Sequence, residues 1–275
     1  MVRFGVDRIM IGAITAGLLG GQYVAPTPPT PPVSGYKLWL DAADTTKITQ
    51  SLNAVSQWTD KSANAYTFTQ STGSAKPTTG IATQNGWNVL SLDGYDSLIS
   101  TAANSTWTFL SNNTTFTAFF AFSTNNSGFQ TIINTNEDQS QYIGMDFVVN
   151  SASAYSVSHD VNNGNTGNAS VSNPTATNSI TTAFTYVTLL SDASNATAAN
   201  RSDIRIKQGS AIKNNTRTTA VNTGTPSYPL TIGMPTNLAN YGLAGTLGEI
   251  LIYTSTLSAG DVLSTQQYLA SKWGV

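Results

Sequence analysis

Short apolar runs, separated by turns rich in Gly, Asn, Asp and Ser, recur along most of this chain. Runs of this length and composition predict β-strands. Residues 116–122 (FTAFFAF) carry apolar side chains at the positions of both faces, so we expect this strand in the centre of a sheet. Further strands are predicted at residues 36–40, 56–69 (a loop, then a strand), 89–92, 97–100, 129–134, 142–149, 184–190, 202–208 and 230–233.

The C-terminal residues 241–275 contain the signals of a strand, a turn and a helix. Residues 247–253 (LGEILIY) have the composition of a buried strand. Ser258, followed three residues later by Asp261, resembles a capping box, and apolar residues then recur at helical spacing. Gly274 suits a left-handed helix end. We therefore predict one short helix that closes a β domain.

The pattern is weakest at residues 151–179, where Ser, Asn, Gly and Thr dominate. Here we expect loops with short strands, one of them at residues 154–158. The single histidine, His159, falls in the polar stretch HDVNNGNTGN, and we interpret it as a surface-loop residue. It has no nearby nucleophile turn of the kind that a catalytic triad uses. We also expect residues 129–134 and 142–149 to be the neighbours of the central strand.

Several motifs occur in the order typical of one family. The ending GLAGTLGEILIYTSTLSAGDVLSTQQYLASKWGV resembles that of concanavalin A-like, laminin-G-like jelly-roll domains. In these domains a strand G-x-[IL]-x-E-[IL]-x-[IL]-Y precedes a helix start L-S-x-x-[DE] and a final K-[WY]-G. The opening runs LWLDAAD (38–44), VSQWTDKS (55–62) and LSLDGYDSL (90–98) agree with the family. The resemblance covers roughly residues 35–275.

The resemblance implies an all-β fold, a two-sheet antiparallel jelly-roll sandwich with one short C-terminal helix. It also implies that residues 184–190 and 202–208 form a hairpin-like unit whose tip lies near Gly209. It does not imply one function, because lectins, glycosidases and purely structural modules share this fold.

Calcium often accompanies the family, and two stretches offer oxygen ligands for it. In the first, Asp160 and Asn162 alternate with other residues before a turn glycine, but the further acids of an EF-hand loop are missing. Asp93 and Asp96 form the second candidate. Ordinary Asx turns explain both patterns as well. Our prediction is that the protein has no cofactor, with calcium as the alternative.

Residues 1–25 form an apolar segment punctuated by glycines. Arg3 and Arg8 before an apolar run are compatible with a secretory signal or an anchor, but the run is too short to span a bilayer. The segment instead repeats with glycines eight positions apart. Its units are similar to the [IL]-x-[IL]-G-x-x-x-[IV] pattern at the N-termini of many tailed-phage virion proteins. We therefore expect a retained docking arm whose contact residues are Ile9, Met10, Ile11, Ile14, Leu18, Leu19, Tyr23 and Val24.

A proline-rich stretch, residues 26–34, follows this arm directly. Such a stretch is stiff and extended, with a rise of about 3.1 Å per residue. We expect it to act as a spacer that holds the domain of residues 35–275 away from whatever binds residues 1–25.

Composition excludes several classes of function. Charged residues amount to 9% of the chain, against about 25% in ordinary soluble domains. A net charge of -2 gives no electrostatic basis for binding nucleic acid or an anionic membrane. The absence of cysteine from the sequence excludes disulfides and thiolate metal sites.

Carboxylate catalysis has little support in the sequence. Retaining glycosidases on this fold use a strand motif E-x-D-x-x-E, which places carboxylates on one face about 5–5.5 Å apart. The chain has two glutamates, Glu137 and Glu249. Glu137 adjoins Asp138 in a loop-like stretch, and Glu249 stands alone in the closing strand, where we expect it to bond to backbone or hydroxyl groups. We therefore predict that the protein is not an enzyme.

Sugar binding would need exposed aromatic rings beside polar groups. Four aromatic residues fall in or near loops rich in Asn, and each could instead cover the ends of the sandwich. The candidates are Trp87, Tyr95, Trp107 and Tyr241.

Together these patterns predict a non-enzymatic bacteriophage virion protein, either a capsid decoration, a head-fibre or a tail-associated protein, that displays a lectin-like sandwich on the virion surface. The expected partners are phage capsid or tail proteins at the arm, further copies of the chain (a trimer would suit a capsid site) and cell-surface glycans bound weakly in many copies. One alternative is a secreted, extracellular bacterial carbohydrate-binding protein. The other is a glycosidase with unfamiliar catalytic residues.

Overall fold

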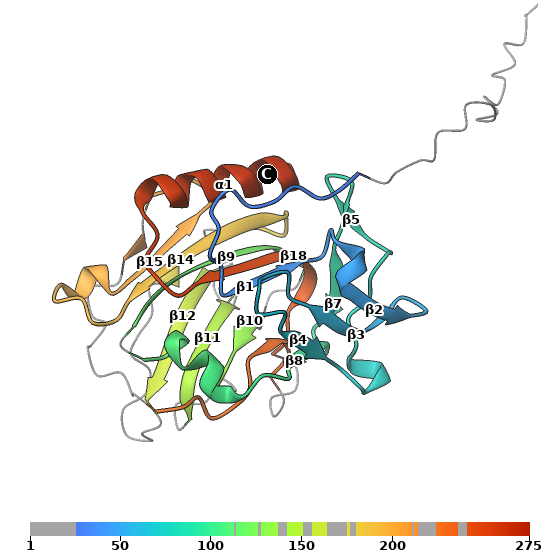
Figure 1. The fold of residues 1–275 in the computed structure, drawn as a ribbon, viewed down its shortest axis with the longest axis horizontal. Helices are drawn as coiled ribbons and strands as arrows, with labels where there is room; N and C mark the ends of the chain where they lie inside the picture. The colour runs from blue at the N-terminus through green and yellow to red at the C-terminus, as the bar shows by residue number, and fades with distance from the viewer. Residues whose placement is uncertain are drawn as a thin grey trace, which may run out of the picture.

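The protein is a sandwich of two antiparallel β-sheets with an α-helix on the outer face of one sheet, as the computed structural model shows (Figure 1). The structure describes residues 26–112, 114–125, 128–136, 142–150, 156–163, 175–176, 180–210, 212–213, 224–235 and 241–275. The inner faces of both sheets meet in one apolar core. The fold class predicted from the sequence is therefore confirmed.

Seven strands form the first sheet, with the closing strand β18 near its centre. Its order is β1–β18–β9–β14–β15–β16, and β7 pairs with β18 beside β1. The strands are Leu38–Asp41 (β1), Leu90–Asp93 (β7), Thr115–Thr124 (β9), Thr185–Asp192 (β14), Ser202–Ile206 (β15), Ile212–Lys213 (β16) and Ala244–Tyr253 (β18).

The neighbours of β9 differ from those expected. β9 lies between β18 and β14, whereas residues 129–134 and 142–149 form strands of the opposite sheet. The apolar pattern of β9 predicted its central place correctly, because its two faces contact the core and the helix side. That pattern says which faces are covered, but not which strands pair with it.

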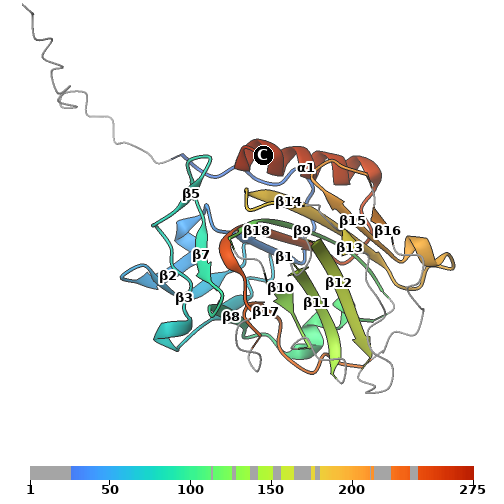
Figure 2. The ribbon, with the colours of Figure 1, turned by 180° about the vertical axis from the view of Figure 1, so that it is seen from behind.

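Nine strands form the second sheet, in the order β13–β12–β11–β10–β17–β8–β4–β3–β2 (Figure 2). The strands are Ile48–Ser51 (β2), Ala54–Thr59 (β3), Thr67–Thr69 (β4), Ser97–Ser100 (β8), Phe129–Asn134 (β10), Ile143–Asn150 (β11), Ser156–Asn163 (β12), Thr175–Ala176 (β13) and Thr231–Gly233 (β17). The shorter elements are a ladder of Thr83–Gln84 (β5) with Trp87–Asn88 (β6), and the 3-10 turns Thr45–Lys47 (η1), Gly73–Ala75 (η2), Asn104–Leu110 (η3) and Ala198–Asn200 (η4).

The predicted hairpin of residues 184–190 and 202–208 is present as β14 and β15, but its tip is not at Gly209. The connection between the two strands contains η4, and Gly209 follows β15, where its N–H donates to the carbonyl of Ile206 at 2.9 Å. The glycine marks the turn towards β16. The family resemblance gave the pairing correctly and the position of the tip wrongly.

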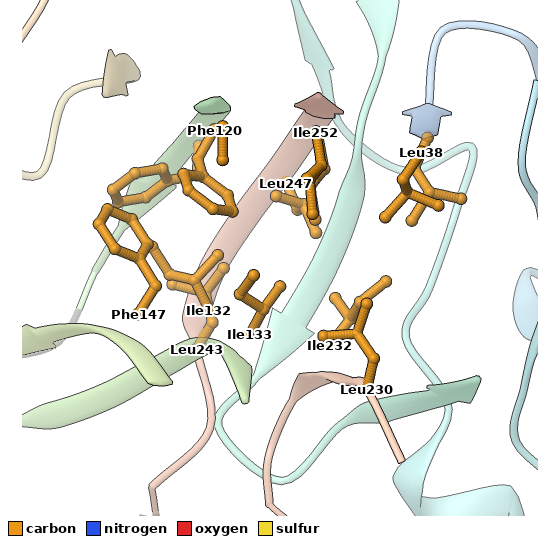
Figure 3. Close-up of a cluster of buried hydrophobic side chains, with 14 of the residues drawn as sticks. Leu38, Phe120, Ile132, Ile133, Phe147, Leu230, Ile232, Leu243, Leu247 and Ile252 are labelled. Atoms are coloured by element: carbon orange, nitrogen blue, oxygen red, sulfur yellow. The ribbon is translucent and has the colours of Figure 1, made fainter. Parts of the chain in front are cut away.

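The core between the sheets is built from large aliphatic and aromatic side chains (Figure 3). Leu38, Phe120 and Ile252 from the first sheet face Phe147 and Ile232 from the second. The rings of Phe120 and Phe147 stack with centroids 4.3 Å apart. Burying such side chains stabilises the folded state by about 1.5–3 kcal/mol each.

The helix α1, Ala259–Trp273, lies on the outer face of the first sheet (Figure 1). It begins as predicted, because the hydroxyl of Ser258 accepts from the backbone N–H of Asp261, and it ends at Gly274 in the left-handed conformation (φ 68°). Its buried side chains, including Trp273, form a second apolar cluster with the outer face of β9 and β18. In the described part of the chain, no helix combines the length and apolarity needed to cross a bilayer.

The proline-rich stretch packs against the sandwich. The phenol of Tyr268 in α1 shares its one hydrogen between the carbonyl of Pro29 at 3.0 Å and Glu249 Oε1 at 2.8 Å, and the phenol of Tyr253 in β18 donates to the carbonyl of Val33 at 2.9 Å. Pro31 is buried. The predicted spacing role therefore cannot belong to residues from Pro29 onward, because these hydrogen bonds hold them on the domain.

Asp41, Glu249 and Lys272 form a buried ion cluster between the first strand, the last strand and the helix. The ammonium of Lys272 lies 2.7 Å from Asp41 Oδ1 and 2.9 Å from Glu249 Oε2, and all three side chains are fully buried. The indole N–H groups of Trp39 and Trp273 donate to the Glu249 carboxylate at 2.7 and 3.0 Å. Burial raises the pKa of Glu249, and the charge of Lys272 opposes that rise.

Candidate functional site

A row of outward-facing side chains crosses the second sheet. Ile133 in β10, Ile232 in β17 and Leu98 in β8 belong to the core, so the next residue along each strand faces the opposite side. Directly opposed residues of antiparallel strands have Cβ atoms about 4.5–5.5 Å apart, so these neighbours form a continuous row. In order across the sheet it contains Asp146, Asn134, Thr231, Ile99, Thr69 and Gln57.

Exposure along this row increases from one end to the other. Asn134 and Thr231 are buried, whereas Ile99, Thr69 and Gln57 are half-buried. The side-chain amide of Asn134 has no hydrogen-bond partner among the described residues. The accessible end of the row, over β8, β4 and β3, is therefore the part that a ligand from solution can reach.

A hollow of about 470 Å³ lies at this accessible end. It is lined by Ser56, Thr69, Gln70, Ser71, Lys76, Ile99 and Ser100. Hydroxyl, amide and ammonium groups dominate, and none of these described lining residues is acidic. Its size falls within the range of about 300–1,000 Å³ that is usual for ligand pockets.

Two backbone segments meet just before β8, at residues 93–96 and 241–244. The N–H of Gly242 donates to the carbonyl of Gly94 at 3.2 Å, and the N–H of Gly94 donates to that of Leu243 at 3.1 Å. A Cβ on Gly242 would lie 2.7 Å from the Gly94 oxygen, and Gly94 itself has φ +96°. Both positions therefore require glycine. Tyr95 follows Gly94 and Tyr241 precedes Gly242, so the two tyrosines flank this backbone contact.

We call Tyr95, Tyr241, Asp93 and Asp96 the tyrosine edge. Tyr95 is 52% exposed and Tyr241 is 38% exposed, and no other aromatic side chain among the described residues is as exposed. The ring of Phe129 supports Tyr241 edge-on, with centroids 5.5 Å apart. The edge thus presents two aromatic surfaces and the exposed carboxyl group of Asp93 to solvent, with Asp96 buried behind them, a combination that can hold an amphipathic ligand.

The two aspartates form the Asx turn that the sequence indicated. Asp93 Oδ1 accepts from the N–H of Tyr95 at 2.8 Å, and Asp96 Oδ2 accepts from the N–H of Asp93 at 3.0 Å. Burial, with the nearby charge of Asp93 and a hydrogen bond between the two side chains, raises the pKa of Asp96 to about 6. The described residues contain no group of three or more His, Asp or Glu side chains that could hold a metal ion. Calcium at this turn stays a prediction.

The tyrosine edge and the hollow are contiguous. Gln70, which lines the hollow, donates through its amide to the hydroxyl of Ser97 at 2.8 Å and to its carbonyl at 3.3 Å. Ser97 begins β8, two residues after Tyr95. A ligand longer than one sugar ring could therefore touch both places.

The other two aromatic candidates do not belong to this site. Trp107 is fully buried in η3, where its indole N–H donates to Ser100 Oγ at 3.2 Å, so its assignment as a sugar-stacking residue is wrong. The polar residues around Trp107 in the sequence did not indicate that this segment forms a 3-10 turn whose tryptophan packs into the core. Trp87 in β6 is half-buried against the second apolar cluster beneath α1, away from Tyr95.

The interpretation of His159 as a surface-loop residue is also wrong. It lies in β12, is buried, contacts Ser202 Oγ through Nδ1 at 3.1 Å and meets the ring of Phe116 edge-on. Small polar residues hid the strand alternation that buries every second side chain here. Asp160 and Asn162 are strand positions rather than members of a cation-binding loop, and their side chains lie outside what the structure describes.

The carboxylates considered for catalysis are not available at the surface of the described chain. Glu249 is held by two indoles, a phenol and an ammonium in the buried ion cluster, so its role is structural as expected; the hydroxyl of Tyr268 is a partner of the predicted kind, and the indoles and the ammonium were not predicted. Glu137 and Asp138 lie outside the described residues. So do the predicted docking residues Ile9, Met10, Ile11, Ile14, Leu18, Leu19, Tyr23 and Val24.

Sequence reasoning missed the hollow and its lysine. Lys76 follows η2 in a stretch, STGSAK, that resembles any polar loop. The hollow exists because β3, β4 and β8 are neighbours in the sheet, although β8 is distant from the other two in sequence. Only a prediction that β4 pairs with β8 could have located the hollow from the sequence. The pattern of apolar residues does not predict which strands pair.

Comparison with known proteins identifies the fold and no family. No family model matches the chain, and no curated protein matches it either. Solved structures do match. An arabinofuranosidase complexed with arabinofuranosyl-alpha-1,2-xylobiose aligns over 89% of this chain, with 11% identity and a TM-score of 0.57. The sialidase of Trypanosoma rangeli, in complex with the inhibitor DANA, aligns over 86%, with 12% identity and a TM-score of 0.54.

A third similar structure is the ligand-binding domain of botulinum neurotoxin serotype D in complex with N-acetylneuraminic acid. It aligns over 85% of this chain, with 12% identity and a TM-score of 0.50. The present chain spans 60% of the arabinofuranosidase structure, 50% of the neurotoxin domain structure and 33% of the sialidase structure. At these identities the similarity establishes a shared β-sandwich fold.

Proposed function

We propose that this protein is a non-enzymatic glycan-binding module whose ligand stacks on the tyrosine edge. The observation that carries the proposal is the exposure of two tyrosine rings, Tyr95 and Tyr241, whose backbones flank the contact between Gly94 and Gly242. Sugar rings have apolar C–H faces that pack on aromatic rings, and hydroxyl groups that hydrogen-bond to carboxylates such as Asp93. A site of this kind combines apolar contact area with a few fixed polar groups.

The structural neighbours support this proposal at the level of the fold. A neurotoxin domain with the same sandwich was solved with N-acetylneuraminic acid, and two glycoside-processing enzymes share the architecture. The fold is thus one on which sugar sites occur. Our choice of the tyrosine edge as the site rests on the exposed residues of this chain and not on its similarity to the solved structures.

The geometry of the carboxylates favours binding over hydrolysis. A glycosidase places two carboxyl groups on either side of the bond to be cleaved, about 5–5.5 Å apart in retaining enzymes and farther apart in inverting ones. Asp96 is instead buried and accepts from the backbone N–H of Asp93, and Asp93 accepts from the backbone N–H of Tyr95, so the two carboxyl groups do not form an open pair. Glu249 has no exposed surface. These two facts support a binding role.

Substitution of the two tyrosines tests the proposal. Tyr95→Ala and Tyr241→Ala should each weaken glycan binding by roughly 5- to 30-fold, because loss of one stacking ring removes about 1–2 kcal/mol. Leu52→Ala is the matched control, since Leu52 is 98% exposed and lies at a separate turn. The measurement is retention on an array of neutral, carboxylated and sulfated oligosaccharides, followed by titration calorimetry. Failure of the intact chain to retain any glycan, or unchanged binding in both variants, would sink the proposal.

We further propose that the sandwich is displayed on a virion surface through residues 1–25, bound to phage capsid or tail proteins, in several copies. Many weak sites on one particle would act together, and linked sites can gain 10²- to 10⁴-fold in avidity. The support is the sequence pattern of the arm. Mass spectrometry of the native protein separates this proposal from secretion, since an intact Met1 supports docking and a start near Ala25 or Pro26 supports a cleaved signal.

A further inference from the structure

The hollow beside the tyrosine edge contains a positive charge without a partner. Lys76 is half-buried in its wall and makes no hydrogen bond or ion pair in the described part of the chain. Other lysines near carboxylates are neutralised: Lys61 binds Asp41 and Asp44, and Lys272 binds Asp41 and Glu249. An unpaired, partly desolvated ammonium attracts an anion more strongly than a fully hydrated one.

The remaining wall groups suit an oxyanion. The exposed hydroxyl of Ser71 and the half-buried hydroxyl of Thr69 line the same hollow, and no lining residue among those described carries a negative charge. Hydroxyls donate to carboxylate or sulfate oxygens, and hydrogen bonds to a charged acceptor are stronger than neutral ones. Ile99 adds an apolar surface at the base of the row.

The position of the hollow indicates whether its anionic ligand is a free ion or a charged group on a larger molecule. It is open to solvent and joins the tyrosine edge through the contact between Gln70 and Ser97. A small free anion would use the lysine alone, whereas a glycan that stacks on Tyr95 and extends along β8, past Ser97 and Gln70, would bring its next sugar unit to the hollow. The shape therefore favours a substituent on a chain over an isolated ion.

We propose that the hollow around Lys76 is an acidic-sugar subsite that binds the carboxylate or sulfate group of a sugar unit adjacent to the one on the tyrosine edge. This inference rests on the proposed glycan-binding function and specifies its ligand class. Selectivity for acidic over neutral glycans is then a property of Lys76, and affinity for the neutral part is a property of the tyrosines.

Binding of matched oligosaccharides tests this subsite. The probes are a neutral oligosaccharide, the same backbone with a uronic acid unit, and the same backbone with a sulfate group. The intact chain should bind the better acidic probe about three- to tenfold more tightly than the neutral one, as expected for one partly exposed charge pair. Lys76→Met should abolish this preference and keep neutral binding, and Lys47→Met, in η1 outside the hollow, should change neither.

Amide chemical shifts locate the binding independently. Glucuronic acid and glucose 6-sulfate should shift the signals of Thr69, Gln70, Ser71 and Lys76, and the shifts should weaken with salt. Shifts at Tyr95 without shifts in the hollow, or an acidic preference that survives in Lys76→Met, would overturn the subsite and leave the glycan-binding function standing. Absence of shifts and of glycan retention altogether would overturn both. A stronger response to one acid than the other decides between carboxylate and sulfate.

Discussion

Asp96 is the residue of the tyrosine edge whose protonation depends most on folding. Burial, aided by the charge of Asp93, raises its pKa to about 6 in the folded chain, whereas an aspartate in an unfolded chain titrates near 3.9. Between these pH values the folded state holds a proton that the unfolded state has released. The contribution of Asp96 therefore favours folding below about pH 4, is lost as the pH rises from about 4 to about 6, and does not recover above that.

Replacement of Asp96 by asparagine should reverse this loss. Asp96→Asn keeps an oxygen that accepts from the N–H of Asp93 but cannot ionise, so we expect the variant to be more stable than the wild type at pH 7 by about 1 kcal/mol. Urea unfolding of the variant and the wild type between pH 4 and pH 7 measures this difference in the free energy of unfolding. Asp44→Asn is the opposite control, because hydrogen bonds from Thr46 and Lys61 lower the pKa of Asp44 against the effect of its burial. Parallel pH profiles for Asp96→Asn and the wild type would contradict the argument.

Residue types in the sequence found half of the candidate site. Tyr95 and Tyr241 stood out as aromatics near turns, and both are exposed in the structure, on either side of the contact between Gly94 and Gly242. Trp107 showed the same signal and is buried. The difference is exposure, which depends on whether a turn folds back onto the core, and local composition does not contain that information.

Among the elements, local signals predicted ends well and partners poorly. The helix α1 begins at the cap of Ser258 and ends at Gly274, as its sequence indicates, because capping involves residues within one turn. The partners of β9 and the strand at His159 were missed. Pairing connects residues far apart in sequence, and in β12 the buried residues Val157, His159 and Val161 alternate with polar residues that hide the pattern.

Contact between β18 and α1 leaves no room for a side chain at Gly248. A Cβ there would lie 2.9 Å from ring atoms of both Phe184 and Trp273, so Gly248→Ala must displace packed rings and should cost about 1–3 kcal/mol of stability. Gly260→Ala, on the open side of the same helix, should be neutral or stabilising by up to about 1 kcal/mol. Thermal unfolding of both variants compares them. Equal melting temperatures for the two would show that the helix is not seated as described.

For the molecule as a whole, the segment before β1 belongs to the stable domain. A chain starting at residue 35 lacks the acceptors Pro29 and Val33, so the phenols of Tyr268 and Tyr253 lose hydrogen bonds. We expect this chain to be less stable than one starting at residue 26 by about 1–3 kcal/mol, since each hydrogen bond contributes about 0.5–1.5 kcal/mol. Chemical denaturation of the two truncated chains and of the full chain measures this difference in the free energy of unfolding. If both truncations unfold alike, the segment does not stabilise the domain.

The placement of β18 also governs when the protein can fold during synthesis. The ribosome makes β18 after all three of the strands that pair with it, β1, β7 and β9, and Lys272, one of the two lysines that pair with Asp41, follows later still. Until then the nascent polypeptide has an open seam in the first sheet, with apolar strand edges that can associate with other chains. Synthesis of β18 and α1 is therefore the event that closes the seam.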